Sequence, residues 1–256
     1  MSLAERAYFT LCRALGWLLR SSRYSTVRIV DADGEPQVRK RRAFHAPLLI
    51  ATGSWLLRSL DTGVLVLSQR EWEERERRLY QCLYDRPIRI AADGSLVLPR
   101  LSGQTLASLL RDRAAEDPLH AKAIEYAVRA LVDFHRRGLS HADAMAENVL
   151  VDLESGVARW FDFETLHDSA RSIVWRRADD VRALLVTCMA RTVPEKQAET
   201  LRLILDVYDD EEVTRMLAGA FVSVMRPPLT FHLGQAGLSL HAYAEIGRLL
   251  GERVGE

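Results

Sequence analysis

Apolar residues recur at three- and four-residue steps in several stretches of the chain, a spacing that predicts amphipathic helices. These stretches cover residues 3–20, 70–84, 105–113, 120–137, 179–191, 195–207, 211–225 and 239–253. Gly138 follows the 120–137 stretch directly, as expected of a residue that ends a helix. The apolar side of the 3–20 helix either packs into the core or contacts a membrane or a partner.

Short β-prone runs separated by turn residues predict three hairpins. The runs pair 25–30 with 37–42, 88–90 with 95–98, and 148–152 with 157–163. Strands and one charged helix thus come first, and a mainly helical part with a single hairpin follows. This order predicts an α+β fold with two lobes. We expect a small N-lobe over residues 1–100, with a sheet and a helix, and a larger, mainly helical C-lobe over 101–256.

A mostly apolar segment over residues 46–57 precedes a second short apolar run at 64–67. A membrane-spanning helix needs roughly 20 apolar residues, and Arg58 and Asp61 interrupt this region before that length is reached. We therefore expect the segment to be buried. The first residues also lack the pattern of a secretory signal, because the segment carries charged residues and ends in arginine and serine rather than in a small-residue cleavage site.

Composition narrows the function classes only slightly. Of the 256 residues, 48% are hydrophobic, which is enough for one large domain or two small lobes. The 35 basic and 35 acidic residues balance, so net charge gives no argument for a nucleic-acid partner. Three cysteines without metal-site spacing, Cys12, Cys82 and Cys188, predict buried reduced thiols in a cytosolic protein.

The segment from Leu139 to Asp162 carries the residue types that phosphoryl transfer requires. Transfer of a γ-phosphoryl group needs Mg²⁺ on the triphosphate and a carboxylate that orients the attacking hydroxyl group. A loop after the 120–137 helix presents Asp143 for the second task. Asn148 offers a carbonyl oxygen to the metal, and the following hairpin returns Asp162 as the charged metal ligand.

The pattern His-x-Asp-x-x-x-x-Asn-Val-Leu-Val-Asp at 141–152, followed by a hairpin and Asp-Phe-Glu at 162–164, resembles the protein-kinase-like superfamily. It is more similar to the bacterial and small-molecule branches, which include lipopolysaccharide-core sugar kinases of the Kdo type and aminoglycoside- or choline-type kinases. Eukaryotic protein kinases usually have Arg at the position of Ala142 and Lys at that of Met145. Glu164 replaces the glycine of Asp-Phe-Gly, and no Ala-Pro-Glu motif follows.

The resemblance implies the bilobal protein-kinase-like fold, with ATP and Mg²⁺ as cofactors. It also implies a strand lysine that binds the α- and β-phosphates and pairs with a helix glutamate. Lys40 lies on a predicted strand and is the only lysine before residue 122, although it also belongs to a basic run. Glu76 is the expected partner, with Glu73 and Glu74 as rivals. Residues 98–101 would form the hinge that reads adenine through its backbone.

Two further roles follow from the resemblance. His141 is expected to form a structural hydrogen bond to the backbone near the metal aspartate, rather than to act as a base. Asp179 and Asp180 match the aspartate that opens the large C-lobe helix, where an N-cap would be the local reason for its presence. We expect this pair to brace the catalytic loop.

One expected feature is missing, because no glycine-rich phosphate loop precedes Lys40. Residues 21–26 occupy its place and contain no glycine. The chain is therefore either a kinase with a degenerate loop or a scaffold that binds nucleotide poorly. The presence of Asp143, Asn148 and Asp162 together favours the enzyme.

These observations favour an ATP- and Mg²⁺-dependent phosphotransferase that acts on a small molecule or a lipid-linked sugar, with lipopolysaccharide core as the preferred acceptor. Such a protein would be cytoplasmic, with a peripheral contact to the inner face of the membrane through segments 3–20 and 46–67. One alternative is an atypical bacterial protein serine/threonine kinase, against which Met145 counts. A pseudokinase-like regulatory module is the other, and the missing glycine-rich loop is its support.

Overall fold

The computed structural model describes residues 6, 7, 10, 25–32, 34–44, 46–59, 61–112, 117–221 and 238–255. The predicted helix over 3–20 lies outside these residues except at three positions. The glycine-free segment at 21–24 and the end of the predicted 211–225 helix also lie outside them.

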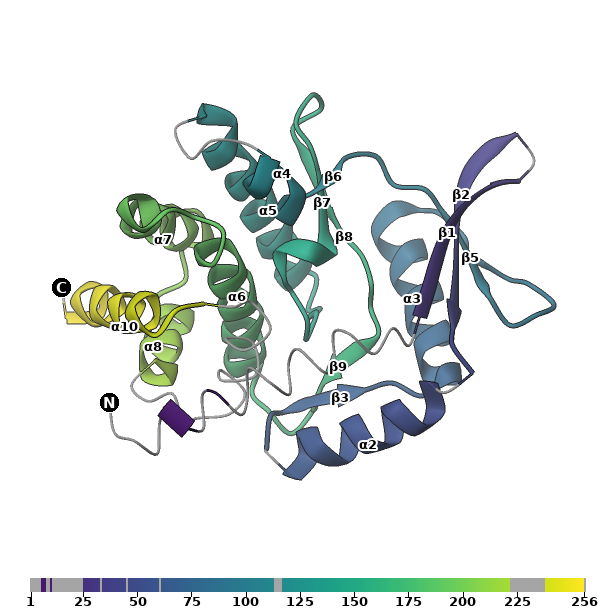
Figure 1. Cartoon of the computed structure of the whole chain (residues 1–256), viewed down its shortest axis with the longest axis horizontal. Coiled ribbons are helices and arrows are strands. Elements are labelled where there is room, and N and C mark those ends of the chain that lie inside the picture. The colour runs from purple at the N-terminus through teal and green to yellow at the C-terminus, as the bar shows by residue number, and fades with distance from the viewer. Residues whose placement is uncertain are drawn as a thin grey trace.

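A four-stranded antiparallel sheet in the order β1-β2-β5-β4 contains the first two predicted hairpins (Figure 1). Its strands are β1 (Ser25–Ala32), β2 (Glu35–Arg42), β4 (Arg89–Ile90) and β5 (Leu96–Pro99). Lys40 pairs in register with Leu96, and both side chains are buried. Alternation along β2 therefore places the Lys40 side chain on the inner face of the sheet.

Helix α3 (Gln69–Tyr84) confirms the charged helix predicted over 70–84. A capping box starts it, because the hydroxyl of Ser68 accepts from the backbone N–H of Glu71 while the Glu71 carboxylate accepts from the N–H of Ser68. Trp72, Leu79 and Tyr80 form its buried stripe, at the three- and four-residue spacing that faces a core.

Residues 46–57 form most of helix α2 (Ala46–Ser59), and the expectation that this segment is buried was wrong for one side of it. Ala46 and Leu57 are buried, but Leu48 is 69% and Trp55 is 70% exposed. The helix leads into strand β3 (Val64–Val66), whose partner is β9 (Thr165–His167). No helix in the described ranges is long and apolar enough to cross a membrane.

The rest of the described chain is mainly helical, so the predicted α+β class is confirmed. Its helices are α4 (Leu106–Asp112), α5 (Pro118–Arg136), α6 (Ile173–Met189), α7 (Pro194–Tyr208), α8 (Glu211–Ala220) and α10 (Leu240–Gly255). Leu131 of α5 and Leu184 of α6 are fully buried in the core that these helices share. The lobe boundary after residue 100 stays a prediction.

A small sheet in the order β6-β7-β8 packs against α4 and α5 and includes the third predicted hairpin. Its strands are β6 (Gln104–Thr105), β7 (Val149–Asp152) and β8 (Val157–Trp160), and a short 3-10 helix (Ala146–Asn148) precedes β7. Gly103 enters this sheet with a φ of +108°, and a Cβ there would lie 2.7 Å from the carbonyl group of Val151. Only glycine fits this close approach of two backbones.

Of the two cysteines in the described residues, Cys188 is buried as expected, whereas Cys82 on α3 is exposed. The expectation of buried thiols was therefore wrong for Cys82. It lies on the solvent side of the helix, opposite the stripe that faces the core.

Candidate active site

Asp143 lies in the loop between α5 and β7, five residues before Asn148. The side-chain nitrogen of Asn148 donates to the carboxylate of Asp143 at 2.8 Å and to its backbone carbonyl oxygen at 2.9 Å. The 3-10 helix at the end of the loop turns the chain so that these two side chains meet. The structure thus brings together the predicted catalytic residue and one predicted metal ligand.

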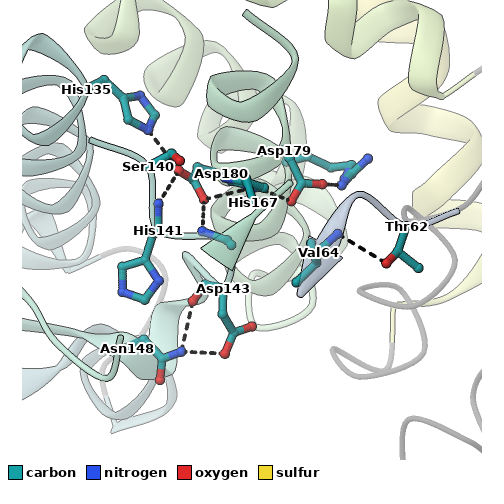
Figure 2. Close-up of polar contacts among 12 residues, drawn as sticks. Thr62, Val64, His135, Ser140, His141, Asp143, Asn148, His167, Asp179 and Asp180 are labelled. Carbon is teal, nitrogen blue, oxygen red and sulfur yellow. Dashed lines mark hydrogen bonds and ion pairs between the residues drawn. The ribbon is translucent and has the colours of Figure 1, made fainter. Parts of the chain in front are cut away.

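Asp180 holds the start of this loop, as Figure 2 shows. Its carboxylate accepts hydrogen bonds from the backbone N–H groups of His141 at 2.7 Å and Ala142 at 2.8 Å. The Nε2 atom of His135 lies 3.0 Å from the same carboxylate. Although burial alone would raise its pKa, the neighbouring His167 and His135 hold the pKa of Asp180 well below its usual range.

The bracing role expected of this aspartate pair is therefore present for Asp180 but is not seen for Asp179, and the N-cap explanation was wrong. Helix α6 begins at Ile173, and Ser172 is its N-cap, accepting from the backbone N–H of Trp175. Asp180 consequently lies in the helix interior, from which it reaches across to the loop. Its neighbour Asp179 contacts His167 of β9 at 3.0 Å and forms an ion pair with Arg182.

Two residues of the site have backbone conformations that L-residues rarely adopt. Ala142 has a φ of +70° and Asp162 a φ of +69°. Such conformations cost on the order of 1–3 kcal/mol each and persist where the surroundings fix them. The hydrogen bond from Ala142 to Asp180 is one such constraint. One strained residue therefore directly precedes Asp143, and the other is Asp162 itself.

His141 has the structural role expected of it. Its Nε2 atom lies 3.0 Å from the carbonyl oxygen of Phe161, directly before Asp162. The ring is fully buried, with Trp160 and Phe163 as aromatic neighbours. Burial lowers the pKa of His141 to about 4, so the imidazole is neutral at pH 7 and fixes the backbone beside Asp162.

Lys40 projects from β2 into a cluster of three carboxylates. Its ammonium nitrogen lies 2.5 Å from Asp162, 2.6 Å from Glu164 and 3.9 Å from Glu76. Burial alone would lower the pKa of Lys40, but these carboxylates together raise it well above its ordinary value. A charged lysine is thus held against the predicted metal ligand, across 122 residues of sequence.

Of the three rival glutamates of α3, Glu76 is the one that faces Lys40. Its carboxylate also accepts from the Nε1 of Trp72 and from the backbone N–H of Phe163, each at 3.1 Å. Burial raises the pKa of Glu76 to about 7, although the charge of Lys40 opposes this rise. Glu73 instead pairs with Gln69, and Glu74 is exposed.

Glu164 is the residue that sequence reasoning missed. The sequence shows that Glu164 replaces a glycine of the resembled motif, but not that its buried side chain pairs with Lys40. A two-residue spacing gives no signal here, because strand alternation does not apply where Asp162 has a φ of +69°. Asp162 and Glu164 have that spacing, and both reach the same ammonium group.

The oxygen donors near Asp143 fit magnesium. The backbone N–H of Phe161 donates to the carbonyl oxygen of Asn148 at 3.0 Å, which keeps Asn148 beside Asp162. The amide nitrogen of Asn148 is used by Asp143, so its amide oxygen is left for a cation. One amide oxygen and one carboxylate fit Mg²⁺, which takes its other ligands from phosphates and water. Within the described ranges, no cluster of three His, Cys, Asp or Glu side chains could hold a metal alone.

Asp143 has the electrostatic character of a base that works near neutral pH. Burial and the nearby charge of Asp162 raise the pKa of Asp143 to about 7, while the hydrogen bond from Asn148 lowers it. A general base is most effective when its pKa lies near the working pH. The arrangement can therefore accept a proton from a hydroxyl group placed next to Asp143.

The chain was compared with protein families, curated proteins and solved structures, and only solved structures match it. No family model and no curated protein matches the chain. Among solved structures, 68 chains match. One is the crystal structure of Rad53 1–466 in complex with AMP-PNP, with 16% sequence identity and a TM-score of 0.37. The match covers 89% of this chain and 57% of the Rad53 chain. This chain therefore spans little more than half the length of that structure.

Proposed function

We propose that the chain is an ATP- and Mg²⁺-dependent phosphotransferase of the protein-kinase-like type, which transfers a γ-phosphoryl group to a hydroxyl group. One observation carries this proposal. Buried Lys40 and the partly exposed Asp162 meet at 2.5 Å beside the loop in which Asn148 holds Asp143. A cation for phosphates, oxygen donors for a metal and a carboxylate for the acceptor are the parts that phosphoryl transfer requires.

Each side chain then has a defined task. Asp143 orients the acceptor hydroxyl group and takes its proton, while Lys40 contacts the α- and β-phosphates. Asn148 and Asp162 are the residues that would hold magnesium, which supplies positive charge for the phosphate oxygens. Glu76 positions Lys40, and Asp180 positions the loop. Catalysis would be mostly positioning and electrostatic stabilisation.

For the acceptor we propose a small molecule or a lipid-linked sugar, with lipopolysaccharide core as the first choice. Leu48 and Trp55 support a peripheral membrane contact at the cytoplasmic face, because both are exposed on one side of α2. An atypical protein kinase would instead phosphorylate itself or a protein partner. A pseudokinase-like regulatory module would bind no nucleotide with magnesium.

The nucleotide site is tested by thermal denaturation with ATP, with and without Mg²⁺, because a ligand that binds only the native state raises its stability. The variant is Asp162→Ala. Its control is Asp206→Ala, which removes a half-exposed carboxylate that pairs with Arg253 far from the site. We expect a magnesium-dependent rise in Tm for wild type and control only. Absence of the rise in the wild type at millimolar ATP would favour the regulatory module.

The acceptor is tested by transfer of radiolabelled phosphate from ATP to lipopolysaccharide-core fragments, free sugars and the protein itself. Label on a sugar that disappears in Asp143→Asn supports the proposal. Label that accumulates only on protein selects the protein-kinase alternative.

A further inference from the structure

A pocket of about 410 Å³ lies between the last turn of α3, the second half of α5 and strand β8, and none of the proposed catalytic residues lines it. Cavities of this size hold small-molecule ligands in many proteins. Its walls combine apolar and aromatic side chains with three arginines. The lining residues that carry the argument are Leu83, Tyr84, Tyr126, Arg129, Arg137 and Arg159.

The charges of the three arginines are not equally balanced. Arg129 forms an ion pair with Glu125 at 2.7 Å. Arg137 donates only to the carbonyl oxygen of Cys82, and Arg159 only to the hydroxyl of Ser102, among the residues that the structure describes. Within the described residues, the guanidinium groups of Arg137 and Arg159 therefore form no ion pair with a carboxylate. A guanidinium group presents five N–H donors, most of which remain available at both positions.

Both guanidinium groups lie near one fixed aromatic wall. The phenol of Tyr84 donates to the backbone carbonyl of Trp160, which ties the end of α3 to β8. Burial raises the pKa of Tyr84, and the positive charges of Arg159 and Arg137 oppose that rise. The two arginines thus stand within electrostatic reach of the same ring, although they come from different elements.

The remaining wall is apolar and closely packed. Tyr126 lies over Gly156, where an added Cβ would be 3.4 Å from its ring. Leu83 and Ala130 complete this side. The pocket therefore combines guanidinium groups with apolar and aromatic side chains, and a matching ligand needs both an anionic group and a small apolar body.

We propose that this pocket binds a phosphorylated small molecule, with the phosphate between Arg137 and Arg159 and the organic part against Tyr84 and Tyr126. Phosphate suits the site better than a carboxylate because its greater charge and its additional oxygens can accept from two guanidinium groups at once. Asp133 is the one carboxylate among the lining residues, and its side chain is 68% exposed. The pocket lining therefore keeps a positive balance.

Phenyl phosphate is the probe, and isothermal titration calorimetry measures its binding to the full chain. The variants are Arg137→Gln and Arg159→Gln, and the control is Arg202→Gln, an exposed α7 residue that makes the same charge change outside the lining. We expect each pocket variant to weaken binding at least about tenfold, the effect of losing one charge-assisted hydrogen bond. The control should bind like the wild type. Circular dichroism checks that each variant is folded.

The same titration in Asp162→Ala separates this site from the proposed nucleotide site, because the pocket should keep its affinity there even if no nucleotide binds. Inorganic phosphate and benzoate form the other arms and should bind more weakly than phenyl phosphate. No binding by the wild type at 10 mM, a level set about tenfold above a millimolar Kd, would overturn the proposal. Equal binding by the arginine variants, or tighter binding of benzoate, would do so as well.

Discussion

The ammonium group of Lys40 lies 2.6 Å from the carboxylate of Glu164, closer than the 3.9 Å that separates it from Glu76. Asp162 is a third carboxylate at the same ammonium group. One positive charge therefore faces three acidic side chains. One of them, Glu164, stands where the resembled motif has a glycine. Without a metal, this cluster should oppose the approach of nucleotide phosphates.

Glu164→Gln should raise the affinity for metal-free ATP. The change removes one negative charge and releases Lys40 from an ion pair, so we expect a gain of about threefold or more from the weakened repulsion. Calorimetric titration with ATP in the presence of EDTA measures it. Glu74→Gln is the matched control, because Glu74 lies on the exposed face of α3. An unchanged or lower affinity in Glu164→Gln would contradict this account of the cluster.

Asp180→Asn should loosen the catalytic loop. An amide keeps one acceptor but places N–H groups against the backbone donors of His141 and Ala142, which lie 2.7 and 2.8 Å from Asp180. We expect a loss of about 2–4 kcal/mol in the free energy of unfolding, measured in urea. Hydrogen exchange at those two amides should accelerate by more than the loss of global stability alone explains. Asp206→Asn should change neither quantity, and slow exchange at both amides in Asp180→Asn would show that another group braces the loop.

Stability should fall on acidification because of His167. Burial lowers its pKa to about 4 in the folded protein, below the usual 6.5. Between these values the unfolded chain binds a proton that the folded protein does not, so the free energy of unfolding decreases as the pH falls from 7 towards 4. In His167→Gln this contribution is absent. Its loss of stability between pH 7 and pH 5 should therefore be smaller than that of the wild type, by about 1–2 kcal/mol.

Urea denaturation at several pH values measures the difference. His241→Gln is the control, because His241 is exposed and lies on α10, away from this cluster. Parallel pH profiles for wild type and His167→Gln would mean that His167 does not resist protonation in the folded state.

Gly103→Ala should destabilise the protein more than Gly94→Ala. Both glycines have a positive φ, of +108° and +74°, so both substitutions carry backbone strain. Only at Gly103 would the new Cβ lie 2.7 Å from the backbone of Val151, whereas no atom is within 4 Å at Gly94. We expect about 1–2 kcal/mol for Gly94→Ala and clearly more for Gly103→Ala. Urea denaturation compares the two, and equal losses would show that β6 can move away from β7.

Local patterns were sufficient for the three hairpins, for most of the described helices and for placing Asp143 and Asn148 in one loop. Strand and helix periods repeat over a few residues, and Asp143 and Asn148 are separated by only five positions, so a single loop determines their contact. The spacing between Lys40 and Asp162 contains no such local constraint. Their contact was not predicted, because the family resemblance implied a glutamate as the partner of Lys40, and the roles of both residues stay predictions.

Other features depend on which surfaces meet in three dimensions. The apolar composition of α2 does not show that Leu48 and Trp55 remain exposed, because hydrophobicity does not specify the covering element. The N-cap of α6 was misplaced because Asp180 has a residue type common at N-caps, although Ser172 has that position. The ring and backbone N–H partners of Asp180 come from α5, β9 and the loop, and no sequence period reports them.

The Lys40–Asp162 contact spans 122 residues, whereas Asp180 reaches the amides of His141 and Ala142 across 39 and 38. Closing a longer chain segment costs more entropy, and contacts distant in sequence tend to form late in folding. We therefore expect the loop with Asp143 to acquire its shape before β2 delivers Lys40. A folding intermediate of this protein would contain the carboxylates of the site without the lysine. The docking of β2 would then complete the sheet and the site in one step.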